Sequence, residues 1–88
     1  MDSYEIRWKH SVEKDLKEIS PKEVRRILKS INSLANNPFP LQAKKLRTTE
    51  RLYRIRVGDY RVIYEVDKEM NVITIYYVRH QKDVYRKI

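Results

Sequence analysis

The sequence predicts a single α+β domain, residues 1–88, in which a helical hairpin covers one face of an antiparallel sheet. A chain of 88 residues suffices for one domain. Helical periodicity marks residues 12–35, and segments rich in Tyr, Ile and Val follow at 52–57, 60–67 and 72–78. Because helices and later strands are segregated along the chain, we expect the helices to lie on one sheet face.

The first expected element is a strand at residues 4–9. Tyr4, Ile6 and Trp8 alternate with polar residues, which is the period of a half-buried strand. Ser11 is placed to cap a short helix that follows. The apolar positions of this helix recur at helical spacing: Val12, Leu16 and Ile19.

A second helix is expected to begin at Ser20. Ser20 fits the N-cap, Pro21 the first helical position, and Glu23 the last position of a capping box. The run Asn-Asn-Pro at 36–38 ends the helix. Its apolar stripe consists of Val24, Ile27, Leu28, Ile31, Leu34 and Ala35.

Residues 39–42 form a connector, after which three strands are expected to make an antiparallel meander. Gly58, the only glycine, lies with Asp59 between the first two strands and indicates a tight hairpin turn. Residues 68–71 form the next turn. A short helix is expected at 82–88.

Positive charge is the strongest compositional signal. Twenty Lys and Arg against 12 Asp and Glu give a net charge of +8 and a pI near 9.8. Residues 44–88 hold 12 of the basic and only 6 of the acidic side chains. A domain with this balance attracts polyanions. The densest segment, 44–61, contains Lys44, Lys45, Arg47, Arg51, Arg54, Arg56 and Arg61.

Composition also argues against several kinds of site. Without cysteine there is no disulfide or cysteine-ligated zinc. His10 and His80 lie far apart in no metal-ligand spacing, so we expect no metal or other cofactor, and His10 is treated as structural. No apolar run approaches the ~20 residues that span a membrane, and the N-terminus lacks a signal peptide. We expect an intracellular, cytoplasmic protein.

Strand alternation predicts where the central cations point. Tyr53, Ile55 and Val57 share the face that packs under the helices, which leaves Arg54 and Arg56 on the other face. Arg61 follows the hairpin turn and should lie near Arg56. A solvated face that discourages edge pairing is one interpretation. Phosphate binding is the other, because guanidinium groups offer bidentate hydrogen bonds to phosphate.

Tyrosines and His80 also allow two interpretations. Most of the seven tyrosines lie in predicted strands, where packing is the ordinary role. Tyr85 follows the last strand and either anchors the terminal helix or stacks on an RNA base and transfers protons. His80 closes the last strand and is either structural or a general acid or base, given its unperturbed pKa near 6.5.

Two segments carry a resemblance to a known family. Residues 52–66, Leu-Tyr-Arg-Ile-Arg-Val-Gly-Asp-Tyr-Arg-Val-Ile-Tyr-Glu-Val, resemble the central motif of the RelE/ParE toxin superfamily. Residues 77–85, Tyr-Val-Arg-His-Gln-Lys-Asp-Val-Tyr, resemble its closing motif, and Lys45-Leu46-Arg47 with the helical hairpin also fit. The resemblance implies a compact sheet related to small microbial ribonucleases.

The resemblance also implies an activity and partners. It implies a toxin of a type II toxin–antitoxin system that cuts mRNA in the ribosomal A site. It further implies a RelB-like antitoxin, expected to be acidic, that wraps the toxin and reaches operator DNA only as part of the complex. A ParE-like toxin that poisons DNA gyrase without nuclease chemistry shares the fold and is the first alternative. A non-catalytic RNA-binding module is a further alternative.

By position, the resemblance assigns catalytic roles to Arg54, Arg56, Arg61, Tyr85 and His80. Some relatives carry lysine at the positions of Arg54 and Arg56, but an arginine does not lose its proton, so these two residues are better phosphate clamps than bases.

Gln81 stands where relatives often have an arginine assigned to the leaving group, a charge that Gln81 cannot supply; Lys82 is a substitute. The further cations expected to contact RNA or the ribosome are Lys44, Lys45, Arg47, Arg51, Arg79 and Lys82.

Overall fold

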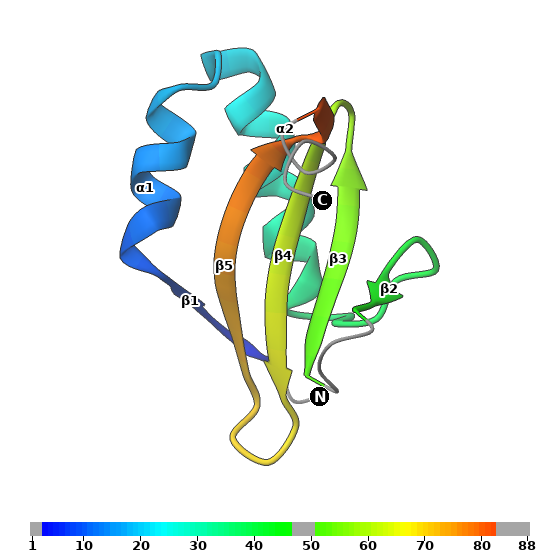
Figure 1. Ribbon diagram of the computed structural model, residues 1–88. Coiled ribbons are helices and arrows are strands. Elements are labelled where there is room, and N and C mark those ends of the chain that lie inside the picture. The colour runs from blue at the N-terminus through cyan, green and yellow to red at the C-terminus, as the bar shows by residue number, and fades with distance from the viewer. Residues whose placement is uncertain (1–2, 47–50, 83–88) are drawn as a thin grey trace.

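A computed structural model of the chain describes residues 3–46 and 51–82 (Figure 1). Two helices and a five-stranded sheet make up this part of the chain, which confirms the predicted α+β class. The elements are β1 (Glu5–Trp8), α1 (His10–Lys17), α2 (Pro21–Leu34), β2 (Lys44–Lys45), β3 (Leu52–Val57), β4 (Tyr60–Asp67) and β5 (Val72–His80).

The strand order is β1-β5-β4-β3-β2. β3, β4 and β5 form the expected antiparallel meander. Two features were not expected from the sequence. β1 joins the sheet parallel to β5, with Ile6 opposite Ile73, and the short strand β2 pairs antiparallel to β3, with Lys44 opposite Arg54. Among the described residues, no helix is long and apolar enough to cross a membrane.

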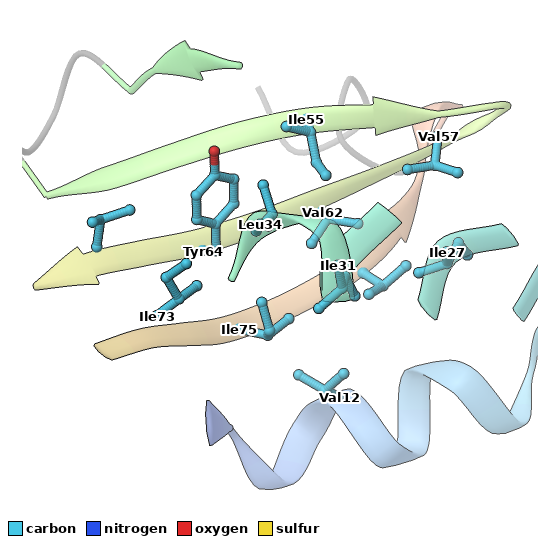
Figure 2. Close-up of a cluster of buried hydrophobic side chains, with 12 residues drawn as sticks. Val12, Ile27, Ile31, Leu34, Ile55, Val57, Val62, Tyr64, Ile73 and Ile75 are labelled. Carbon is cyan, nitrogen blue, oxygen red and sulfur yellow. The ribbon is translucent and has the colours of Figure 1, made fainter. Parts of the chain in front are cut away.

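The core lies between α2 and one face of the sheet (Figure 2). Ile27, Ile31 and Leu34 form the fully buried part of the predicted apolar stripe of α2, and they meet the side chains of β3, β4 and β5. In Figure 1, α2 lies behind the sheet and α1 lies beside β5. The sheet face toward the viewer carries no helix from the described residues and is called the open face below.

Helix capping differs from the prediction in detail. α1 begins two residues earlier than predicted, at His10, with Lys9 rather than Ser11 as its N-cap. The expected cap, Ser11, is therefore inside the helix, and its hydroxyl donates to the carbonyl of Tyr76 at 3.1 Å because β5 lies alongside. Ser20 is the N-cap of α2 as predicted, with Pro21 at the start of the helix.

The predicted capping box of α2 does not form. The hydroxyl of Ser20 makes no capping hydrogen bond. The carboxylate of Glu23 accepts instead from the guanidinium of Arg26, one turn along the helix, at 3.4 Å. An ion pair on the helix surface thus takes the place of the bond back to the N-cap.

The turn between β3 and β4 depends on Gly58. Gly58 has φ +60°, a left-handed conformation that side chains with a Cβ adopt at a cost. Val57 pairs directly with Tyr60, so the hairpin is as tight as the sequence predicts. The turn fixes the register of the two strands and therefore the relative positions of their arginines.

A β-bulge at Tyr76 changes which side chains of β5 reach the open face. Tyr64 pairs with Ile75, but Ile63 pairs with Tyr77, so Tyr76 is an extra residue in β5. Ile75 points to the helices, and without the bulge the side chain of Tyr77, two residues later, would also point to the helices. The bulge reverses the alternation and places Tyr77 and, two residues on, Arg79 on the open face.

Candidate nucleic-acid interface

Three arginines form a row across the open face near the Gly58 turn. Arg56 on β3 is directly opposite Arg61 on β4, and Arg61 is directly opposite Arg79 on β5. Neighbouring strands lie about 4.8 Å apart, so the three backbone positions adjoin. Arg54 shares this face, because Ile55 between Arg54 and Arg56 points into the core with 1% of its surface exposed.

A pocket of about 170 Å³ lies at this end of the open face. The predicted cations Arg54, Arg56 and Arg61 all line it, together with Lys44 from β2. Ile55 and Gln42, in the connector before β2, complete the lining. This volume is large enough to admit a small anion. We call it the cationic pocket.

The lining of the cationic pocket contains four basic side chains and no carboxylate. Arg56 donates from Nε to the carbonyl of Gly58 at 2.9 Å, a bond that orients its guanidinium and leaves its charge uncompensated. No described carboxylate forms an ion pair with Arg54 or Arg56. Such a concentration of guanidinium groups favours binding of phosphate, which accepts paired hydrogen bonds from arginine.

The backbone of Arg79 belongs to the row of arginines, but its guanidinium does not line the cationic pocket. Nη1 forms an ion pair with the carboxylate of Asp15 on α1. The guanidinium also lies 5.0 Å from the centroid of the Tyr77 ring. Arg79 was predicted to contact RNA as a cation, but the structure does not bring it together with Arg54, Arg56 and Arg61.

His80 is also separated from the cationic pocket. It pairs with Tyr60 across the sheet, and their rings meet edge to face with centroids 5.2 Å apart. Nδ1 of His80 accepts from the backbone N–H of Lys82 at 3.1 Å. Since successive strand residues point to opposite faces, His80 lies on the helix side of the sheet while Arg79 lies on the open side.

The other residues predicted for the site are placed in three different ways. Lys45 and Arg51 line a second pocket of about 330 Å³, at the opposite end of β3, with Phe39 and Tyr53. Lys82 is exposed at the end of the described chain. Arg47 and Tyr85 lie outside the described residues, as does most of the predicted helix at 82–88.

Gln81 is held by its backbone rather than by its amide. Its N–H donates to the carbonyl of Asp59 at 2.7 Å, which fixes the end of β5 to the hairpin turn. Its side-chain Oε1 is buried without a hydrogen-bond partner among the residues the structure describes. The position therefore offers an amide, and no charge, beside the end of the arginine row.

The strand tyrosines are buried or half-buried, and Tyr53 and Tyr60 pack against the core that contains Tyr64. Tyr64 is fully buried, and its hydroxyl donates to the carbonyl of Pro38 at 2.8 Å. Burial raises the pKa of the Tyr64 phenol above its usual value, with a smaller contribution from Tyr53. Partial burial, followed by the nearby carboxylate of Glu65, raises the pKa of the Tyr76 phenol. The packing role predicted for the strand tyrosines is confirmed for Tyr64.

Sequence reasoning missed two residues that shape this region. Gln42 lines the cationic pocket, but it has no distinguishing sequence context apart from the nearby lysines. Asp15 is an ordinary helix-surface acid by sequence. Its contact with Arg79 depends on how α1 lies against β5, which no local signal reveals.

Comparisons with known proteins give one answer. Residues 6–85 match the family described as the ParE toxin of the type II toxin–antitoxin system, parDE. Toxin RelE3 of Methanocaldococcus jannaschii is 38% identical over 77 residues, which cover 82% of this chain and 84% of that protein. Toxin RelG of Mycobacterium tuberculosis is 25% identical over 85 residues, covering 96% and 98% of the two chains.

A solved structure agrees with the sequence relatives. The archaeal RelE–RelB complex from Pyrococcus horikoshii OT3 contains a chain that superposes with a TM-score of 0.81 at 33% identity, covering 90% of this chain and 96% of that chain. The family match over residues 6–85 includes the helical hairpin, the meander and the strands that carry the cationic pocket. This chain belongs to the RelE/ParE superfamily and is a toxin of the type II toxin–antitoxin class.

Proposed function

We propose that this toxin is a cytoplasmic endoribonuclease that cleaves mRNA in the A site of the ribosome and so arrests translation. One observation carries the proposal: Arg54, Arg56, Arg61 and Lys44 line one pocket that has no carboxylate in its wall. Basic side chains at such density favour a phosphate ligand, and RNA supplies phosphates in a row.

The proposed reaction is an internal transesterification without a metal ion. The ribose 2′-hydroxyl attacks the adjacent phosphorus, forming the P–O2′ bond and breaking the P–O5′ bond. The products are a 2′,3′-cyclic phosphate and a 5′-hydroxyl end. One proton leaves the attacking oxygen for a base, and another reaches the departing oxygen from an acid. The arginines hold the non-bridging oxygens and stabilise the charge that grows on them in the transition state.

The acid and base are assigned by resemblance and by geometry. Arginine stays protonated, so Arg54 and Arg56 serve as clamps rather than bases. Tyr85, which lies outside the described residues, is the first candidate for the base by resemblance, because a phenol can transfer a proton. His80 is the second candidate, although its ring lies against Tyr60 and its Nδ1 already accepts a hydrogen bond. Lys82 is the candidate that supplies charge where Gln81 cannot.

Dependence on the ribosome follows from this sparse set of groups. Clamps that hold a phosphate do not by themselves align the 2′-hydroxyl for attack in line with the leaving oxygen. Orientation of reacting groups contributes several kcal/mol to catalysis. In the proposal the ribosome holds the mRNA in that alignment, and the toxin contributes charge and proton transfer.

An antitoxin would control the toxin by covering the cationic pocket. The related Pyrococcus horikoshii toxin was solved as a RelE–RelB complex. For this chain, with a net charge of +8, we propose an acidic RelB-like segment that wraps the domain and competes with RNA for the arginines. The complex, rather than the toxin alone, would bind operator DNA.

Mapping of mRNA ends in a translating lysate tests the proposal. Wild type should produce breaks at fixed positions within codons on ribosomes. The double variant Arg61→Ala, Tyr85→Phe should lose them, whereas Arg25→Ala, which removes an exposed α2 cation, should cut like wild type. Undiminished cutting by the double variant would overturn the assignment of the site.

The family description favours a second candidate, because the matching family is named for the ParE toxin. A ParE-like toxin would poison DNA gyrase and leave mRNA intact. Induction of the toxin in cells separates the two. Stabilised gyrase–DNA breaks with intact mRNA support the ParE-like function, and mRNA breaks on ribosomes support the nuclease.

A further inference from the structure

Asp15 fixes the end of β5 from the side. β1 ends at Trp8, opposite Ile75, so the rest of β5 has no strand on that edge. One oxygen of the Asp15 carboxylate accepts from the backbone N–H of Val78 at 3.0 Å, and the other pairs with Arg79. The Asp15 side chain is only 14% exposed, so both contacts are partly sheltered from water.

The pairing with Asp15 changes what Arg79 can do. Its charge is balanced by the carboxylate, so it attracts phosphate less than it would without Asp15. At the same time, its guanidinium is held over the ring of Tyr77, 5.0 Å from the centroid. Arginine and tyrosine in this arrangement form a cation–π pair.

The Tyr77–Arg79 pair adjoins the cationic pocket. Arg79 is opposite Arg61, which lines the pocket. Tyr77 is opposite Ile63, and Ile63 is opposite Arg54. With strands about 4.8 Å apart, Tyr77 lies roughly 10 Å from the backbone of Arg54, across the open face. An RNA strand with one phosphate in the pocket therefore has a neighbouring base within reach of Tyr77.

We infer that Tyr77 and Arg79, held by Asp15, form a nucleobase-stacking subsite beside the phosphate pocket. The inference rests on the proposed RNA site and adds a base contact to it. Aromatic rings and guanidinium planes both stack on unpaired bases, and every base has a π-face, so the subsite accepts bases with little regard to sequence. Asp15 is a positioning residue that keeps the Arg79 guanidinium over the Tyr77 ring and out of the cationic pocket.

The test compares two uncleavable oligonucleotides that differ in one base. Both are 2′-O-methyl RNA, and one carries an abasic sugar at the position next to the bound phosphate. Wild type should bind the complete oligonucleotide about 5- to 100-fold more tightly than the abasic one, which is the usual effect of one base–aromatic stack. Tyr77→Phe should keep the difference. Tyr77→Val should abolish it and leave the affinity for the abasic oligonucleotide unchanged.

Asp15→Asn gives an independent result. Asparagine still offers an oxygen to the N–H of Val78 but no charge to Arg79. The freed guanidinium should then turn to phosphate, so the salt dependence of binding should steepen by about 0.7 in the slope of log K against log salt. The preference for the complete oligonucleotide should fall. A merely structural ion pair would change the melting temperature and neither of these two quantities.

A wild-type protein that binds both oligonucleotides equally, or Tyr77→Val protein that still prefers the complete one, overturns the inference. If Tyr77→Val does not fold, NMR on wild type decides. The Tyr77 ring protons should move upfield with nucleoside 5′-monophosphate and stay in place with ribose 5-phosphate. The cationic pocket is tested separately. If Arg54→Ala and Arg56→Ala leave the affinity for the abasic oligonucleotide unchanged, the proposed function fails rather than the stacking subsite.

Discussion

Arg56 and Arg61 stand directly opposite each other in the hairpin that Gly58 closes. Like charges at opposed positions of an antiparallel pair are destabilising, by an amount comparable to other cross-strand pairs, about 0.2–1 kcal/mol. A fold that keeps this arrangement loses stability at the site that we propose binds an anion. Removing one arginine of this pair should therefore affect both the free energy of unfolding and the affinity for an anion, and both effects can be measured.

Replacing Arg56 should lower the affinity for RNA without lowering the free energy of unfolding. Arg56→Thr removes one of the opposed charges and introduces a residue that favours strands, at the loss of an exposed hydrogen bond to Gly58. We expect the free energy of unfolding to stay constant or rise by up to about 1 kcal/mol. Affinity for single-stranded RNA should fall, with the salt slope smaller by about 0.7. Chemical denaturation and fluorescence anisotropy measure the two effects.

A phosphate titration completes that comparison. A ligand that binds only the folded state raises the melting temperature, so phosphate should stabilise wild type more than Arg56→Thr. Arg25→Ala, which removes a cation of α2 away from the open face, should respond like wild type. Equal stabilisation of wild type and Arg56→Thr would show that Arg56 does not hold the anion.

The hairpin turn should tolerate little change at Gly58. Gly58→Ala places a Cβ on a backbone with φ +60° and within 3.4 Å of the side chains of Arg26 and Glu23. The left-handed conformation costs a residue with a side chain about 1–2 kcal/mol, so we expect a loss of that size in urea denaturation. Gly58→Asn should lose less, because asparagine adopts this conformation more readily. Equal losses for both variants would contradict the conformational explanation.

The sequence was sufficient to predict that Arg54, Arg56 and Arg61 lie together on one sheet face, because the signals for this are local. Alternation in β3 predicts the direction of Arg54 and Arg56, and the Gly58 turn predicts the register that brings Arg61 beside them. Three strands and the second helix follow from the same short-range periodicities. Each of these predictions depends on residues only a few positions apart.

The errors have long-range causes. Arg79 was predicted only as a further RNA-contacting cation, and its ion pair with Asp15 was not foreseen, because only tertiary packing brings the two residues together. Ser11 was expected to cap α1, and it bonds instead to the carbonyl of Tyr76, 65 residues away. The parallel pairing of β1 with β5 is likewise a contact between the two ends of the chain, for which a single sequence gives no pattern.

The core should depend strongly on α2. Ile31 is fully buried between α2 and the sheet (Figure 2). Ile31→Ala removes three buried carbon atoms and leaves a cavity, which should reduce the free energy of unfolding by about 2–5 kcal/mol. Leu41→Ala, at a fully exposed leucine, is the matched control and should cost less than about 0.5 kcal/mol. Denaturant titration of both variants measures the difference, and similar losses would contradict the assigned core.

Tyr64 should make the domain sensitive to alkaline pH. Burial raises the pKa of its phenol in the folded protein above the value of about 10 that it has when unfolded. Above pH 10 the unfolded chain then holds fewer protons than the folded one, so the free energy of unfolding falls as pH rises. The contribution of this group to the slope approaches about 1.4 kcal/mol per pH unit.

Tyr64→Phe isolates that contribution. At neutral pH the variant should be less stable than wild type by about 1 kcal/mol, because the hydroxyl no longer donates to the carbonyl of Pro38. Above pH 10 wild type should lose stability faster than the variant, so the two curves should converge and then cross. Urea denaturation at intervals from pH 7 to about pH 11.5 measures both curves. Parallel curves over that range would mean that Tyr64 ionises as readily in the folded protein as in the unfolded chain, and that its burial does not hold the phenol neutral.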